Sequence, residues 1–183
     1  MEMTHRKFQI VSGFTLIELL IVTAITTLIA AVGGDVLIST FRSSNKANII
    51  NEINQNANFV MSSIESVARN AKCAYLNVGK LVIIDQFNSR NEFSFGSVSG
   101  VNAALKAVNG GSSFSMTNTN DQNGVNVVTA SSSFNVTPNL TNCTAKNPLI
   151  DVSLTLEQAP NAPGRIDYQA RSTFVKSIEI RNY

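Results

Sequence analysis

Residues 14–32 form a run of nineteen residues in which Glu18 is the only charged side chain. Together with Gly33, the run reaches the ~20 residues that an α-helix needs to cross the hydrocarbon of a bilayer. Arg6 and Lys7 precede it. By the positive-inside rule, the start of the chain then stays in the cytoplasm and everything after Gly33 is exported. The sequence therefore predicts a single-pass membrane helix.

The acid in this run needs an explanation. A carboxylate near the centre of a membrane helix costs roughly 2.5 to 3.5 kcal/mol, and less near the interface, so Glu18 requires a compensating partner. A secretory signal peptide is the competing interpretation, with Ala30-Ala31 or Gly33-Gly34 as its small-residue cleavage site. The length of the run and an acid near its beginning count against that interpretation.

Residues 13–18, which read Gly-Phe-Thr-Leu-Ile-Glu, resemble the prepilin signature of type IV pilins and of the pseudopilins of type II secretion and DNA uptake. In that family a membrane peptidase cuts after the glycine, on the cytoplasmic side, and methylates the new terminal amine. The resemblance implies a leader peptide over residues 1–13, cleavage after Gly13, and Phe14 as the N-methylated terminus. It also implies that Glu18 pairs with the Phe14 amine of a neighbouring subunit.

The helix is expected to continue beyond the membrane. No proline occurs between Gly34 and Lys72, and apolar residues recur there at spacings of three and four. These residues mark one helical face: Ile49, Ile53, Ala57, Val60, Ile64, Val67 and Ala71. A helix over residues 14–72 would be about 88 Å long at 1.5 Å per residue, with an amphipathic continuation over residues 34–72.

Gly33 and Gly34 interrupt this helix where members of the resembled family often have a proline. Each glycine weakens a helix by ~1 kcal/mol relative to alanine, which predicts bending or melting at this point. An equally good interpretation is that the glycines let neighbouring helices approach closely.

From Cys73 onward, short alternating segments replace the helical pattern. They predict strands at residues 81–85, 92–98, 124–130, 133–137, 149–156 and 172–182, separated by Gly, Asn, Ser and Pro. So many consecutive strands favour a largely antiparallel sheet packed on the amphipathic helix. The expected fold class is therefore α+β and pilin-like, with a long N-terminal helix, membrane-spanning over residues 14–33, on a β head over residues 73–183.

Two cysteines, Cys73 and Cys143, lie in the part expected to be exported, where a disulfide is permitted. Closing a loop of this length contributes roughly 4 kcal/mol in the chain-entropy model. Such a bridge would clamp the predicted helix end to the sheet. Two free thiols are the alternative.

A polar segment at residues 118–126 loosely resembles a calcium loop, although it lacks the alternating acids and the terminal Glu of a strong motif. Its oxygen donors would be Asn118, Asn120, Asp121 and Asn123. An Asn-Gly turn between strands explains the segment equally well, so we expect no metal site.

An enzyme is not expected. His5 is the single histidine, the basic residues are scattered, and no catalytic residue or cofactor motif stands out. The resemblance implies a structural subunit, a major or minor pilin of a type IV pilus, or alternatively a pseudopilin of a secretion or DNA-uptake system. Its partners would be copies of itself and other pilins, the prepilin peptidase, the assembly machinery and, before assembly, the membrane. The sequence leaves binding to DNA or to surfaces open, but no feature in it supports either.

The implied location is the membrane, with the N-terminus cytoplasmic and the head outside, and then an extracellular pilus or a periplasmic pseudopilus. An exported binding domain on a signal anchor is the alternative from a different functional class.

Overall fold

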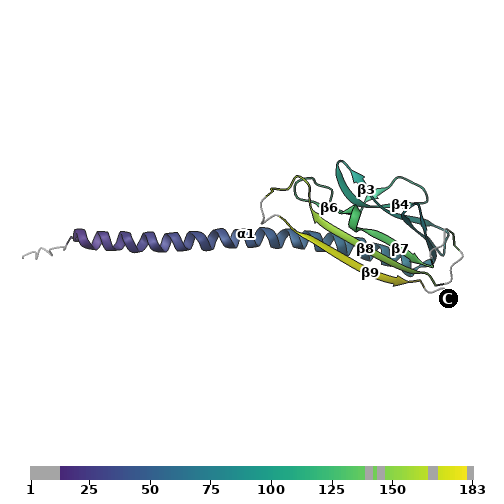
Figure 1. Ribbon diagram of the computed structural model, residues 1–183, viewed down its shortest axis with the longest axis horizontal. Helices are drawn as coiled ribbons and strands as arrows, with labels where there is room; N and C mark the ends of the chain where they lie inside the picture. Colours follow the sequence, from purple (N-terminus) through teal and green to yellow (C-terminus); the bar gives the residue numbers. More distant parts are fainter. Residues whose placement is uncertain (1–12, 139–141, 144–146, 165–168, 181–183) are drawn as a thin grey trace, which may run out of the picture. The chain divides into compact units, whose positions relative to one another are not determined.

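The computed structural model describes residues 13–138, 142–143, 147–164 and 169–180, and the chain divides into two compact units between Arg42 and Ser43. Helix α1 (Leu16–Arg69) begins in the first unit and ends in the second (Figure 1). The predicted leader over residues 1–13 lies outside the described residues, except for Gly13.

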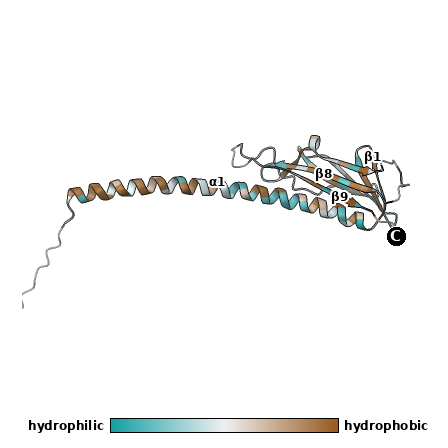
Figure 2. Ribbon diagram, turned by 60° about the horizontal axis from the view of Figure 1, so that its bottom comes forward, coloured by the Kyte–Doolittle hydropathy of each residue, from teal (hydrophilic) through white to brown (hydrophobic). Residues whose placement is uncertain are grey.

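From Leu16 onward, the first unit is a helix without a core. None of its residues is buried, and its surface is dominated by apolar side chains (Figure 2). By length and composition this helix is apolar enough to cross a membrane. This finding agrees with the prediction of one membrane-crossing helix near the N-terminus.

In the second unit, α1 becomes amphipathic and buries one face. Of the predicted face, Ile53, Ala57, Val60 and Ile64 are buried, and Ile49 and Val67 pack partly against the core. Met61 and Ala68 are buried as well. The helical periodicity of three and four therefore identified this face correctly up to Val67.

Two antiparallel sheets complete the second unit (Figure 1). The five-stranded sheet has the order β1 (Ala71–Asn77), β2 (Lys80–Asp85), β3 (Arg90–Val98), β4 (Val101–Val108) and β5 (Phe114–Ser115). In the other sheet, β8 (Leu149–Gln158) pairs with β6 (Val125–Val127), β7 (Ser133–Thr137) and β9 (Arg171–Glu179). A short 3₁₀ helix, η1 (Thr129–Ser131), joins β6 to β7.

Strand β8 shows how the sheets and α1 share one core. Its alternate residues Ile150, Val152, Leu154 and Leu156 are buried in the same cluster as the apolar face of α1. β9 pairs with β8 over nine residues without a register shift. This pairing settles the register of β9, which the sequence pattern left open, because Phe174 and Ile178 face the core while Val175 is exposed.

The predicted helix end at Lys72 is wrong. α1 ends at Arg69, and Ala71 and Cys73 lie in β1. Ala71 continues the helical spacing, so periodicity alone could not place the boundary. The carbonyl of Asn70 instead accepts a hydrogen bond from the N–H of Gln86 at 3.2 Å, which turns the chain into the sheet.

Three strands were not predicted, β1, β4 and the short β5. The segment of β4 reads Val-Asn-Ala-Ala-Leu-Lys-Ala-Val, and alanine favours helices over strands. It is a strand because residues 101–108 pair with β3 along their whole length and bury Val101 and Ala103. Conversely, the strand predicted over residues 124–130 is shortened to β6, since the chain enters η1 at Thr129.

Candidate assembly site

Thr15 and Glu18 form a capping box at the start of α1. Glu18 Oε2 accepts hydrogen bonds from the Thr15 N–H at 3.1 Å and from Thr15 Oγ1 at 3.0 Å. In return, Thr15 Oγ1 accepts a bond from the Glu18 N–H at 3.3 Å. Because Thr15 is the capping residue, α1 begins at Leu16 and not at Phe14 as predicted.

This geometry gives the Glu18 carboxylate a local role. A negative charge in the first turn stabilises the positive end of the helix dipole, and Oε2 accepts both Thr15 bonds. Oε1 has no hydrogen-bond partner among the described residues and is left to accept another donor. The Thr-x-x-Glu spacing was the sequence signal for this capping box, and the sequence analysis missed it.

Three threonines in the apolar part of α1 satisfy their hydroxyls within the helix. Thr23 donates to the carbonyl of Leu19 at 2.9 Å, and Thr26 donates to that of Val22 at 2.7 Å. Thr27 donates in the same way to the carbonyl of Thr23 at 2.7 Å. Since each hydroxyl has a partner in its own helix, these side chains can lie in hydrocarbon without an unsatisfied donor.

The predicted processing and bending residues lie at or within this helix. Gly13 and Phe14 precede α1, and Phe14 is exposed. α1 stays helical through Gly33 and Gly34, where an added Cβ would meet nothing within 4 Å. The helix is therefore not melted at the glycines. The expected bend stays a prediction, and the open space beside the glycines leaves room for another helix to approach.

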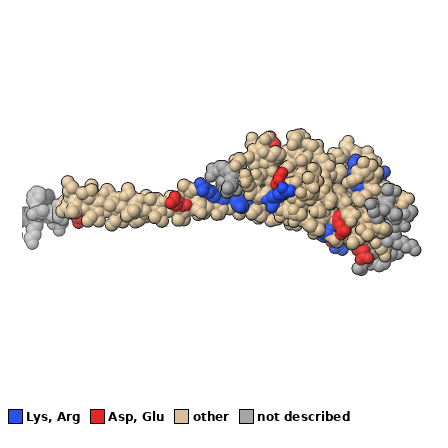
Figure 3. Space-filling model, in the orientation of Figure 1, with Lys and Arg blue, Asp and Glu red and all other residues tan. Residues whose placement is uncertain are grey.

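Residues 19–34 carry no charge, and this stretch has no red or blue surface in Figure 3.

The two cysteines are joined as predicted. Cys73 of β1 forms a disulfide with Cys143, which lies in the loop before β8, and their Cα atoms are 5.5 Å apart. The alternative of two free thiols is therefore wrong. The expectation that the bridge clamps the end of the helix to the sheet is also wrong, because Cys73 belongs to a strand. The bridge links the five-stranded sheet to the loop leading into the other sheet.

A cluster of charges connects α1 to β9 in the second unit. Lys176 Nζ donates to Glu65 Oε2, and Arg69 Nη2 donates to Glu65 Oε1 at 2.6 Å. The hydrogen bond from Lys176, followed by that from Arg69, lowers the pKa of the Glu65 carboxyl. Glu65 and Lys176 are 111 residues apart, so no local sequence pattern could have paired them.

The loop considered for calcium uses its amide oxygens internally. Asn118 Oδ1 accepts the N–H of Asn120 at 3.1 Å. Asn120 Oδ1 in turn accepts the N–H groups of Gln122 at 3.0 Å and Asn123 at 3.1 Å. Two of the four predicted oxygen donors therefore hold the loop in shape, which is the usual role of Asn side chains in turns.

The rest of this loop is equally constrained. Asp121 Oδ2 accepts a bond from Asn161 Nδ2 at 3.2 Å. A Cβ on Gly124 would lie 2.5 Å from the carbonyl oxygens of Asn118 and Asn120, so the loop requires glycine there. Across the described part of the chain, no three His, Cys, Asp or Glu side chains gather where they could hold a metal ion.

Comparison of the chain with protein-family models, with curated proteins and with solved structures gave no match.

Proposed function

We propose that this chain is a structural subunit, a major or minor pilin, of a type IV pilus or a related helical filament. The observation that carries the proposal is the first unit, a helix apolar enough to cross a membrane, with no buried residue and one capped acid at its start. Such a surface is stable only in lipid or against other apolar helices. A filament built from many copies supplies the second environment.

Cleavage after Gly13 is part of this proposal, and it leaves the capping box intact, because Thr15 and Glu18 both lie beyond the cut. The new amine of Phe14 then becomes a cation at the membrane surface. In the filament, this amine of one subunit donates to Glu18 Oε1 of its neighbour. An acid excluded from water needs such a partner, and the pair fixes the register between the two copies.

The same features support the pseudopilin of a type II secretion or DNA-uptake system as a second form of the proposal. In all these systems the head lies outside the cytoplasmic membrane, and the disulfide suits an oxidising compartment. The prepilin peptidase, other pilins and the assembly machinery are the proposed partners.

One observation favours a different functional class, an exported binding domain on a signal anchor. The Thr15 bonds give Glu18 a partner within its own chain, so a solitary helix could tolerate this acid. Substituting Glu18 by Ala separates the two classes. A filament subunit carrying Glu18→Ala should insert in the membrane at normal levels but lose most of its assembly, because the neighbour's amine has no acceptor. Thr15→Val is the matched control, since it removes the two bonds made by the Thr15 hydroxyl and keeps the carboxylate.

The measurement is the ratio of protein in filaments to protein in the membrane. Extracellular filaments are sheared from the cells, and periplasmic filaments are collected after the subunits are overexpressed. Unchanged assembly of the Glu18→Ala variant contradicts the proposed pairing. N-terminal mass spectrometry of the mature protein should show N-methylphenylalanine at Phe14, and Gly13→Val should abolish the mature species. Recovery of mature-sized protein from the Gly13→Val variant, or of Met1 on the natural protein, rejects the proposed processing.

A further inference from the structure

Phe87 stands out on the second unit because a rigid turn holds its ring in solvent. The side chain is 91% exposed, at the turn between β2 and β3. Asp85 Oδ1 fixes this turn by accepting the N–H groups of Phe87 at 2.9 Å and Ser89 at 2.7 Å. The Gln86 N–H donates to the carbonyl of Asn70, just after the end of α1, and so places the turn at that end of the unit.

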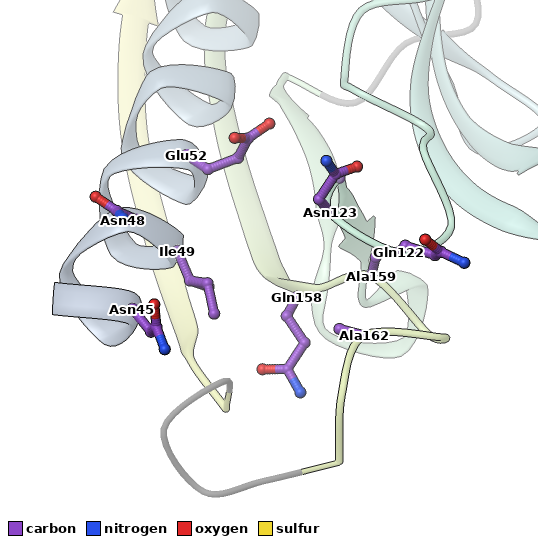
Figure 4. Close-up of a pocket in the computed structure, with 10 residues that line it drawn as sticks. Asn45, Asn48, Ile49, Glu52, Gln122, Asn123, Gln158, Ala159 and Ala162 are labelled. Carbon is purple, nitrogen blue, oxygen red and sulfur yellow. The ribbon is translucent and has the colours of Figure 1, made fainter. Parts of the chain in front are cut away.

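A pocket of about 210 Å³ lies toward the other end of the same unit, where α1 enters it (Figure 4). Ile49 of α1 contributes apolar surface, together with Ala159 and Ala162 from the segment after β8. Polar side chains line the rest of the pocket, among them the amides of Asn45 and Gln158 and the carboxylate of Glu52. The pocket thus offers an apolar patch beside polar groups, and protein interfaces combine an apolar core with polar surroundings in the same way.

The ring and the pocket match in size but cannot meet within one copy. An apolar cavity of roughly 150 Å³ already binds benzene, so the volume of this pocket is enough for a phenyl ring. Ile49 at the pocket and Asn70 beside the Phe87 turn are separated by roughly 30 Å along α1, at 1.5 Å per residue. The ring of one molecule can therefore reach only the pocket of another.

We propose that Phe87 of one subunit inserts into the Ile49–Ala159–Ala162 pocket of a second copy of this chain. The inference rests on the proposed function and adds a contact between heads to the contact between helices. It is heterologous, because two different surfaces meet, and each copy carries both of them. Contacts of this kind repeat from copy to copy and build open helical filaments when the rotation does not close a ring.

Cysteine cross-linking in the assembled filament tests this contact. Cells that produce full-length Gln86→Cys and Ala162→Cys subunits together, with Phe87 kept in both, should give a cross-linked dimer after their filaments are treated with a short bismaleimide. Each variant alone should give none, since the contact brings residue 86 close to residue 162 and never two identical positions together. Val78→Cys is the matched control for Gln86→Cys. Val78 is 94% exposed on the turn at the opposite end of β2, and with Ala162→Cys it should not cross-link.

A second measurement uses the amount of filament. Phe87→Ser should lower it by about tenfold or more, the scale expected for losing a buried aromatic anchor, whereas Val78→Ser should leave it unchanged. Filaments that form normally with Phe87→Ser and show no 86–162 dimer overturn the contact and leave the proposed filament function standing. A wild-type protein found only as single molecules overturns both.

Discussion

The two units of this chain share helix α1 but differ in what happens to its apolar side chains. Up to Arg42, α1 exposes its large apolar side chains on every side; from Ser43 onward, it buries one face under two sheets. The first part has no stable environment in water by itself, and the second supplies its own core. The comparison shows that burial within the chain marks the part that folds alone, whereas exposed apolar surface marks the part completed by lipid or other copies.

Removing the disulfide should give the largest change in stability. Because the disulfide lies wholly in the second unit, this change tests whether the two units behave independently. Replacing Cys73 and Cys143 by Ser should lower the free energy of unfolding of the head by about 4 kcal/mol, since the unfolded chain loses a long closed loop. Urea unfolding of the detergent-solubilised protein, followed by pulse proteolysis, measures this loss. Membrane insertion of the variant should stay normal, and a defect in insertion would contradict the independence of the two units.

Matched isoleucines on the two parts of α1 sharpen the comparison. Ile64 is fully buried in the core. Ile64→Ala should therefore lower the free energy of unfolding of the second unit by about 3 kcal/mol, through lost burial and the cavity left behind. Ile25 is exposed in the first unit, and Ile25→Ala should change the same unfolding energy by less than about 0.5 kcal/mol. Equal effects in the urea experiment would mean that the two parts of the helix do not differ as described.

Substituting Val78 should stabilise the second unit by a small amount, whereas the preceding substitutions destabilise it. It has φ +47°, a left-handed conformation that costs a β-branched residue about 1 kcal/mol or more. Val78→Asn should therefore raise the melting temperature of the head by a few degrees. Val175→Asn is the control, because this valine is also largely exposed, at 72%, but lies within strand β9. Stabilisation by both substitutions would show that lost apolar exposure, not backbone strain, is the cause.

The smallest expected effect concerns the link between α1 and β9. The bonds from Lys176 and Arg69 lower the pKa of Glu65 below 4.5, so the folded state favours the ionised carboxyl. This stabilisation is complete above pH 4.5 and is lost as the pH falls through the lowered folded pKa. Glu65→Gln should therefore make the melting temperature less dependent on pH between about 5 and 2. A variant with the wild-type dependence would exclude Glu65 as a contributor.

Much of the fold follows from local patterns, and the errors occur where tertiary contacts decide. β7 has the predicted boundaries because its short alternating run ends at a proline, and β8 has the predicted start. β1 and β4 were missed because their alanines carry no strand preference, and only pairing with β2 and β3 makes them strands. The candidate assembly residues were found from a short motif, whereas the capping bond from Thr15 became clear from the structure.

By itself, the sequence determined the apolar helix, its solitary acid and the buried face that follows, because these depend on composition and on a period of 3.6 residues. The tertiary structure decided where α1 ends, that Cys73 meets Cys143, that Lys176 reaches Glu65, and that Phe87 and the Ile49–Ala159–Ala162 pocket lie at opposite ends of the second unit. These features join residues far apart in the chain. Only folding brings such residues together, and no local pattern encodes which of them will meet.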